Sequence, residues 1–248
     1  MGFYFMGPVD VPDYPPGRMV RIYVPKRAHQ SERPVLFLFD GQNVFDDAPS
    51  FAGGWRAHET VEKLAKNVPP PIIVGIDHGG DKRIAELSPF SFGRNRGGAD
   101  GFIDWMCRWL VPHLAHHFSA TRDPRKIVVG GSSMGGLAAL YALLSRPDTF
   151  GGCIAMSPSL WIAGRRIFSW AEGRNAPRDA RIYLDAGKRE PAGMLQNADG
   201  MDKLLHRKGA RNLHFYSDPY GGHSEAAWRK RLIRALRFQF GSSKGLPY

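Results

Sequence analysis

The chain has 248 residues, of which 43% are hydrophobic, and its 34 Lys and Arg residues against 23 Asp and Glu residues give a formal net charge of +11. This length and composition suit one large α/β domain and exclude a wholly disordered chain. No recognition motif accompanies the basic charge, so nucleic acid is not an expected partner.

The N-terminal residues 1–17 contain several prolines and lack both the basic region and the long apolar region of a signal peptide. We therefore interpret them as an N-terminal extension of a single domain that spans residues 1–248. No apolar run approaches membrane-spanning length, so no membrane partner is expected and the cytoplasm is the default location. A homodimer is one option for the assembly.

Apolar runs and helical patterns alternate along the rest of the chain. Residues 19–25 alternate like an edge strand, and a Gly- and Arg-rich surface loop is predicted at 91–101. Apolar runs predict buried strands at 34–41 and 70–77. Further strands are predicted at 125–131, 150–158, 181–187 and 212–218. Helical patterns lie at 58–67, 100–118 (interrupted by Pro112), 134–146 and 225–240. This order predicts a mostly parallel sheet with helices on both faces.

The last helical pattern holds the densest group of basic residues in the chain. We interpret this group as a solvated face of an amphipathic helix, opposite an apolar face. Its members are Arg229, Lys230, Arg231, Arg234 and Arg237.

Two adjacent serines follow the strand predicted at 125–131, in the stretch "VVGGSSMGGLAALYALL". A phosphate-binding loop is excluded because no lysine follows its last glycine, and a dinucleotide motif is excluded because Ser132 replaces its second glycine. The G-x-S-x-G pattern of a nucleophile elbow fits with Ser133 at its centre, flanked two residues away by Gly131 and Gly135. Ser133 is therefore the candidate nucleophile. The backbone N–H of Met134, at the helix start, is a candidate oxyanion donor.

A serine nucleophile needs a histidine base and an acid that orients the base. Of the histidines late in the chain, His206 lies in a helical pattern and His214 in a strand pattern. His223 lies in a Gly-rich loop before the last helix, where it can reach a serine on another strand. The acid should follow the strand predicted at 181–187, where Asp185 and Glu190 both qualify.

The remaining reactive residues indicate neither a metal nor a disulfide. Cys107 and Cys153 have no CxxC partner and are interpreted as small buried side chains. Three histidines with helical spacing have no carboxylate or thiol to complete a ligand set, so no metal site is predicted. They are His113, His116 and His117.

Taken together, the segments resemble the "putative-esterase" (esterase D-like) family of α/β hydrolases, over nearly the whole chain. The resemblance rests on "LFLFDGQNVFD", "IIVGID" followed by "RIAELSPF", "GGSSMGGLAALYALLSRPDTFGG", "AMSPSLW", "YLDAGKRE" and "GGHSEAAWRKRL". It implies the α/β-hydrolase fold and ester chemistry through a Ser-His-acid triad without a cofactor. It also favours Glu190 over Asp185 as the acid and implies that the Gln42 N–H is the second oxyanion donor.

The expected function is hydrolysis of a small ester with a short or aryl acyl group. Three aromatic residues on segments near the predicted sheet edge are candidates for the substrate pocket: Trp55, Trp161 and Tyr220. Three arginines on nearby loops favour an anionic substrate: Arg83, Arg94 and Arg96. Two alternatives stay open, an acyltransferase with the same triad and a non-catalytic basic binding module on the same scaffold.

Overall fold

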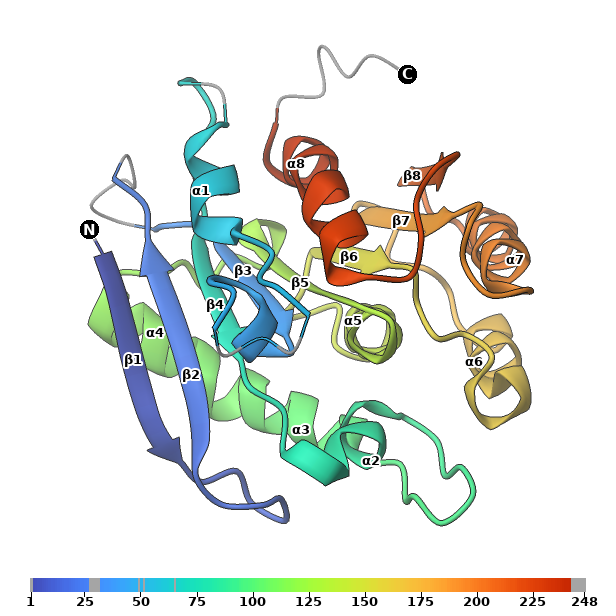
Figure 1. Cartoon of the computed structure of the whole chain (residues 1–248), viewed down its shortest axis with the longest axis horizontal. Helices are drawn as coiled ribbons and strands as arrows, with labels where there is room; N and C mark the ends of the chain where they lie inside the picture. The colour runs from blue at the N-terminus through green and yellow to red at the C-terminus, as the bar shows by residue number, and fades with distance from the viewer. Residues whose placement is uncertain (1, 27–31, 49, 51, 65, 242–248) are drawn as a thin grey trace.

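The computed structural model describes residues 2–26, 32–48, 50, 52–64 and 66–241. Within them one eight-stranded sheet has the order β1-β2-β4-β3-β5-β6-β7-β8 (Figure 1). The strands are β1 (Gly2–Val9), β2 (Arg18–Val24), β3 (Val35–Phe39), β4 (Ile72–Ile76), β5 (Ile127–Ser132), β6 (Gly152–Met156), β7 (Arg181–Gly187) and β8 (Asn212–Asp218). The helices are α1 (Ala57–Glu62), α2 (Arg83–Leu87), α3 (Ala99–Trp105), α4 (Val111–Phe118), α5 (Met134–Ser145), α6 (Ile162–Glu172), α7 (Met194–Arg207) and α8 (Glu225–Phe240).

Strand direction gathers the candidate site at one edge of the sheet. Strands β4, β3, β5, β6, β7 and β8 run parallel to one another. Their carboxyl ends therefore share one edge, where the loops that follow β3, β5, β7 and β8 meet. This arrangement confirms the predicted mostly parallel sheet.

The first strand corrects the prediction for the N-terminus. Strand β1 pairs antiparallel with β2, from Gly2 opposite Val24 to Val9 opposite Arg18. Residues 2–9 therefore form the outer strand, and residues 19–25, predicted as the edge, lie one position inside it. The exposed, Pro-interrupted sequence concealed the strand because it has no single buried face.

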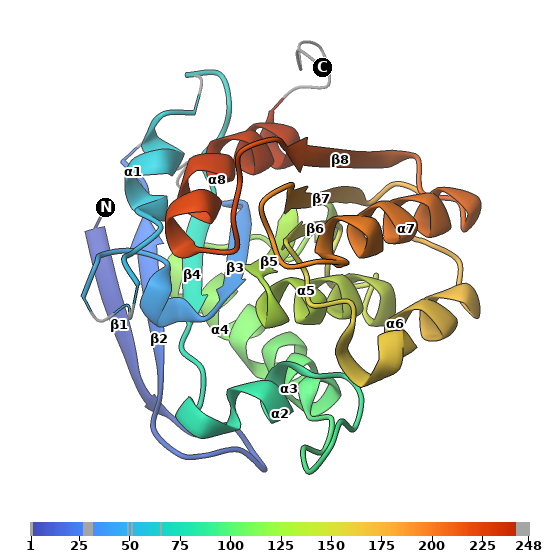
Figure 2. The same ribbon diagram turned by 45° about the vertical axis from the view of Figure 1, so that its right-hand side comes forward.

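The two faces of the sheet bury separate cores. In β3 the side chains alternate, with Phe37 and Phe39 packed on one face and Leu36 and Leu38 on the other. Helices α3, α4, α5, α6 and α7 contribute to the first core, whereas α1 and α8 contribute to the second. Figures 1 and 2 show α1 and α8 together on one side of the sheet and α5 on the other. A strand buried on both faces explains the continuous apolar runs of the sequence.

The long helical stretch at residues 99–118 contains an irregularity before its proline. Residues 106–110 form a π-helical segment, in which the N–H of Val111 donates to the C=O of Met106, five residues back. Pro112 follows as the second residue of α4. The predicted interruption is therefore a wider helical turn that accommodates a residue without an N–H.

Other local predictions differ in detail. The loop predicted at 91–101 ends early, because α3 begins at Ala99. The helix predicted at 58–67 runs from Ala57 to Glu62 as α1, and Ala65 lies outside the described residues. Helices α2 and α6 were not predicted; α6 contains three residues with left-handed dihedrals, which interrupt any helical periodicity. No helix among the described residues is long and apolar enough to cross a membrane.

Candidate active site

Ser133 lies at a sharp turn between β5 and α5. Its φ of 53° and ψ of −117° are outside the regions that L-residues normally occupy, a conformation that costs about 1–3 kcal/mol and persists only where the surroundings enforce it. The turn brings Gly131 and Gly135 so close that a Cβ on Gly131 would lie 2.7 Å from the Gly135 carbonyl carbon. Position 131 therefore requires glycine, and a Cβ on Gly135 would be tightly placed, 3.1 Å from the Phe39 Cβ, as the elbow pattern demands.

Ser133 and His223 are in direct contact. Ser133 Oγ lies 3.0 Å from His223 Nε2, although the two residues are 90 positions apart in the sequence. His223 belongs to the loop between β8 and α8, and the ring of Trp228 packs edge-on against it, with ring centroids 4.9 Å apart. This contact holds the imidazole beside the serine.

Glu190 contacts the other nitrogen of the histidine. Its Oε2 lies 3.3 Å from His223 Nδ1, while its Oε1 accepts hydrogen bonds from the Ser157 hydroxyl and, at 2.8 Å, from the Gly187 N–H. Burial opposes ionisation, but hydrogen bonds from His223, Ser157 and Gly187 and the charge of Arg231 outweigh it and lower the pKa of Glu190. Glu190 is therefore ionised at neutral pH.

Asp185, the other candidate acid, lies within β7, before the loop that holds Glu190. Its carboxylate is fully buried and accepts from the Ser157 N–H at 3.1 Å and from the Tyr183 hydroxyl at 3.1 Å. Burial raises its pKa to about 6, and the nearby Arg231 limits the rise. None of the side-chain hydrogen bonds of the described residues joins Asp185 to His223, so the geometry brings Glu190, not Asp185, to the histidine.

Arg231 supports the acid side of the site from α8. Its guanidinium lies 3.0 Å from Asp185, 3.5 Å from Glu190 and 3.7 Å from Asp218, and it donates to Ser157 Oγ at 2.7 Å. Its side chain is only 2% exposed, so the solvated face predicted for the basic group is wrong at this position. Arg231 lies three residues after Trp228 and four before Ala235, on the buried face of α8. This helical spacing is the sequence signal that could have indicated its burial.

Two further serines were missed. The Ser159 hydroxyl lies 3.1 Å from Ser133 Oγ, and the Ser159 N–H donates to the Ser133 carbonyl. Ser157 is buried and joins Glu190, Arg231 and Trp228 through its hydroxyl. Both follow β6 in "AMSPSLW", a segment that parallel pairing places beside the elbow, but nothing in its residue types distinguishes it from an ordinary turn.

The two predicted oxyanion donors lie in the segments that directly follow β5 and β3. Met134 is the first residue of α5, and Gln42 lies in the short helical turn Gly41–Asn43 that follows β3. Within the described part of the chain, neither N–H has a hydrogen-bond acceptor. The turn around Gln42 is fixed by Asp40, whose φ is 59° and whose carboxylate accepts two hydrogen bonds from Arg83, at 2.6 and 2.7 Å. Arg83 is thus engaged within the protein.

The three predicted substrate-binding aromatics have different surroundings. Trp161 is 49% exposed and packs edge-on against Phe92, and Tyr220 is 75% exposed, with the Arg189 guanidinium over its ring. Trp55 is only 2% exposed, because it packs against Trp228 and its indole N–H donates to Glu225. Trp55 is therefore a core residue rather than a pocket wall. Arg94 and Arg96 are exposed.

The described residues contain no group of three or more His, Cys, Asp or Glu side chains arranged to hold a metal ion. The rings of His113 and His117 contact each other, with centroids 4.3 Å apart. Cys107 and Cys153 are free thiols.

Glu225, the first residue of α8, is a half-buried carboxyl group next to the site. It accepts hydrogen bonds from Asn43 at 3.1 Å and from Trp55, and so connects the Gln42 turn to the His223 loop. Burial is the main reason that the pKa of Glu225 rises to about 7, and the nearby Asp40 adds to it. This acid therefore becomes ionised within the neutral pH range.

The raised pKa of Glu225 predicts a pH-dependent effect of the variant Glu225→Gln. Below the unfolded-state pKa of about 4.3 both states bind the proton. Between that pH and about 7 the unfolded state releases the Glu225 proton while the folded state still binds it. The free energy of unfolding therefore falls as the pH rises through this range. The glutamine cannot ionise. The Tm of the variant relative to the parent should therefore be higher at pH 8 than at pH 4.5.

The measurement is thermal unfolding of parent and variant across that pH range, with Glu172→Gln on the exposed side of α6 as the control. The control should show a difference in Tm that changes little with pH. A Glu225→Gln difference that stays constant, or falls as pH rises, would contradict the assignment.

The fold and the serine elbow define an α/β hydrolase. The chain belongs to the esterase family described as "Putative esterase", whose model matches residues 16–239.

Among curated proteins, the chain is similar to iron(III) enterobactin esterases of Dickeya dadantii and Escherichia coli K12. It is 27% identical to the first over 227 residues and 28% identical to the second over 226 residues. These alignments cover 84% and 88% of this chain but 48% and 52% of the relatives. The chain thus spans about half the length of these relatives.

Solved structures show the same fold. The enterobactin esterase of Shigella flexneri, in a crystal structure determined in the presence of enterobactin, matches with a TM-score of 0.75 and 26% identity, over 90% of this chain and 55% of that one. The BES protein of Bacillus cereus matches with a TM-score of 0.77 over 96% of this chain and 94% of that one, at 22% identity.

Proposed function

We propose that this chain is a serine ester hydrolase whose triad is Ser133, His223 and Glu190. The observation that carries the proposal is the unbroken line of contacts from Ser133 Oγ to His223 Nε2 and from His223 Nδ1 to Glu190, at 3.0 and 3.3 Å. An ionised carboxylate on Nδ1 leaves Nε2 as the proton acceptor that faces the serine. A binding module that had lost catalysis would not need to retain these contacts together with a strained elbow.

The proposed reaction has two steps. In the first, His223 Nε2 removes the proton of Ser133 as Oγ attacks the ester carbonyl, and the N–H groups of Met134 and Gln42 stabilise the oxyanion. The imidazolium then protonates the departing alcohol, which leaves an acyl group on Ser133. In the second, His223 activates a water molecule that releases the acid.

For the substrate, we propose an ester of the siderophore class, such as enterobactin. The support is the similarity to several enterobactin esterases and the positive net charge, which favours an anionic ligand. Of the three aromatics predicted for the pocket, Trp161 and Tyr220 are exposed and available for an aryl group. Incubation with enterobactin and chromatography of the products tests this proposal. Linear hydrolysis products support it; unchanged enterobactin alongside turnover of simple esters would refute the substrate but not the triad.

Among simple esters, we expect the enzyme to hydrolyse those with short acyl groups fastest. The described residues include no long apolar insertion that resembles a lid for lipid chains, so a long acyl chain would remain largely in water. We expect kcat/KM for p-nitrophenyl esters to fall at least about tenfold from butyrate to palmitate, which corresponds to about 1.4 kcal/mol of transition-state binding. A constant or rising series, measured below the micelle concentration, would contradict this prediction.

Adding alcohols to the assay and measuring transesterified product separates hydrolysis from acyl transfer.

A further inference from the structure

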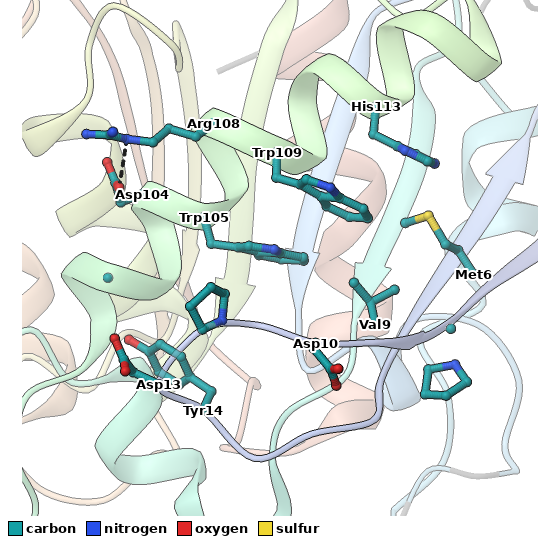
Figure 3. A pocket seen from close by; sticks show the side chains of 14 residues that line it. Met6, Val9, Asp10, Asp13, Tyr14, Asp104, Trp105, Arg108, Trp109 and His113 are labelled. Carbon is teal, nitrogen blue, oxygen red and sulfur yellow. Dashed lines mark ion pairs between the residues drawn. The ribbon is translucent and has the colours of Figure 1, made fainter.

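A cavity lies apart from the candidate active site. It has a volume of about 820 Å³ and lies between the helical stretch 101–113 and the N-terminal segment 6–14 (Figure 3). None of the proposed triad or oxyanion residues lines it. We refer to it as the Trp109 groove. Because it shares no residue with the proposed reaction, its function can be examined independently.

One wall of the groove consists of stacked aromatic rings. Trp105 and Trp109 are nearly parallel, with centroids 5.5 Å apart and an interplanar angle of 17°, and His113 stacks on Trp109 at 4.9 Å. Figure 3 shows both indole rings on the helix, above Val9 and Asp10 of the N-terminal segment. Trp109 is 38% exposed, although tryptophan is a large side chain that folding usually buries. The groove therefore presents part of the Trp109 indole to a ligand, whereas Trp105 is buried behind it.

The charge of the lining is negative, in contrast to the chain as a whole. Asp10, Asp13 and Asp104 line the groove, whereas Arg108 is the only Lys or Arg among its described lining residues and pairs with Asp104 at 2.8 Å. Burial and the neighbouring His117 and His116 lower the pKa of His113, so it adds no charge at neutral pH.

Asp10 and Asp13 are exposed and have spare acceptor capacity. Asp10 accepts one hydrogen bond, from the Gly17 N–H at 3.3 Å, and among the described residues no side-chain hydrogen bond or ion pair involves the Asp13 carboxylate. Both carboxylates are thus free to pair with a ligand.

We propose that the Trp109 groove binds an organic cation, a substituted ammonium group on an apolar body. A cation is attracted both to the exposed part of the Trp109 indole and to the two carboxylates. A neutral apolar ligand would instead remove Asp10 and Asp13 from water without a partner, and an anion would be repelled by them. In a chain of net charge +11, this locally acidic aromatic surface selects cations.

Choline and its neutral isostere 3,3-dimethylbutan-1-ol test the proposal, because they have nearly the same shape and differ in charge. Titrations of the full chain, followed by tryptophan fluorescence and calorimetry, should give saturable binding of choline at least about tenfold tighter than that of the alcohol. Higher salt should weaken choline binding because it screens the exposed carboxylates. Equal affinities, or no saturation by choline, would overturn the proposal.

Variants locate the site. Trp109→Leu and the double variant Asp10→Asn with Asp13→Asn should each weaken choline binding at least fivefold while leaving ester hydrolysis unchanged. The control Asp81→Asn, an exposed carboxylate outside the groove, should bind choline as the parent does. Because Trp109→Leu changes packing, its Tm is measured as well, and the double variant provides the test that leaves the rings intact. Choline affinity that is unchanged in both variants would rule out this groove as the binding site.

Discussion

Ser133→Ala is expected to lower kcat/KM for ester hydrolysis by at least about 10,000-fold, since removal of the nucleophile leaves only the contribution of the oxyanion donors and substrate binding. The fold should survive. Among the described residues, the replaced hydroxyl forms hydrogen bonds only with His223 and Ser159, and alanine removes no apolar group. Steady-state kinetics and a thermal unfolding curve of the same preparation separate loss of chemistry from loss of structure.

Ser132 and Ser159 provide matched controls for the serine. Ser132 is buried as the last residue of β5, and Ser159 contacts Ser133 Oγ but does not contact His223 through any side-chain hydrogen bond found among the described residues. Ser132→Ala and Ser159→Ala should each retain activity within about a hundredfold of the parent, since a positioning hydrogen bond contributes far less than a nucleophile. If Ser159→Ala were as inactive as Ser133→Ala, the assignment of the nucleophile would need revision.

Glu190→Gln is expected to lower kcat by about 100- to 10,000-fold, since an amide in place of the carboxylate can donate to Nδ1 and thus favour the wrong tautomer of His223. The replacement also removes the negative charge that stabilises the imidazolium formed in each step. Kinetics at several pH values, with substrate at saturation, measure the effect on kcat directly.

Asp185→Asn is the control for the acid, because Asp185 shares the Arg231 and Ser157 contacts of Glu190 but not the contact with His223. Both variants disturb the buried charges around Arg231, so both should lower the Tm. Only Glu190→Gln should lower kcat by more than about tenfold. The reverse ranking would give the acid role to Asp185.

The sequence predicted the architecture well where local patterns carry the information. Continuous apolar runs located the parallel strands, because strands buried on both faces have no polar alternation. The glycines at positions 131 and 135 distinguished Ser133 from Ser132, because the elbow leaves no space for a side chain at position 131 and little at position 135. Strand β1 was not predicted, because its mostly exposed side chains form neither an alternating apolar pattern nor a continuous apolar run.

The surroundings of the site could not be predicted in the same way. Ser157 and Arg231 are 74 residues apart and meet only because β6 and α8 pack together. Arg231 was placed on a solvated face because arginine is rarely buried, although here three carboxylates surround it. Trp55 was placed in the pocket from its nearness to the Gln42 turn, but its indole turns toward Glu225 and the core. Such contacts depend on tertiary packing rather than on local sequence.

Labelling with a fluorophosphonate, followed by peptide mass spectrometry, tests the central claim most directly. Such a reagent phosphonylates a serine only where a base and oxyanion donors activate it. We expect stoichiometric modification of Ser133, strongly slowed in His223→Ala and absent in Ser133→Ala. Modification of Ser132 or Ser159 instead, or no modification of the folded parent chain, would contradict it.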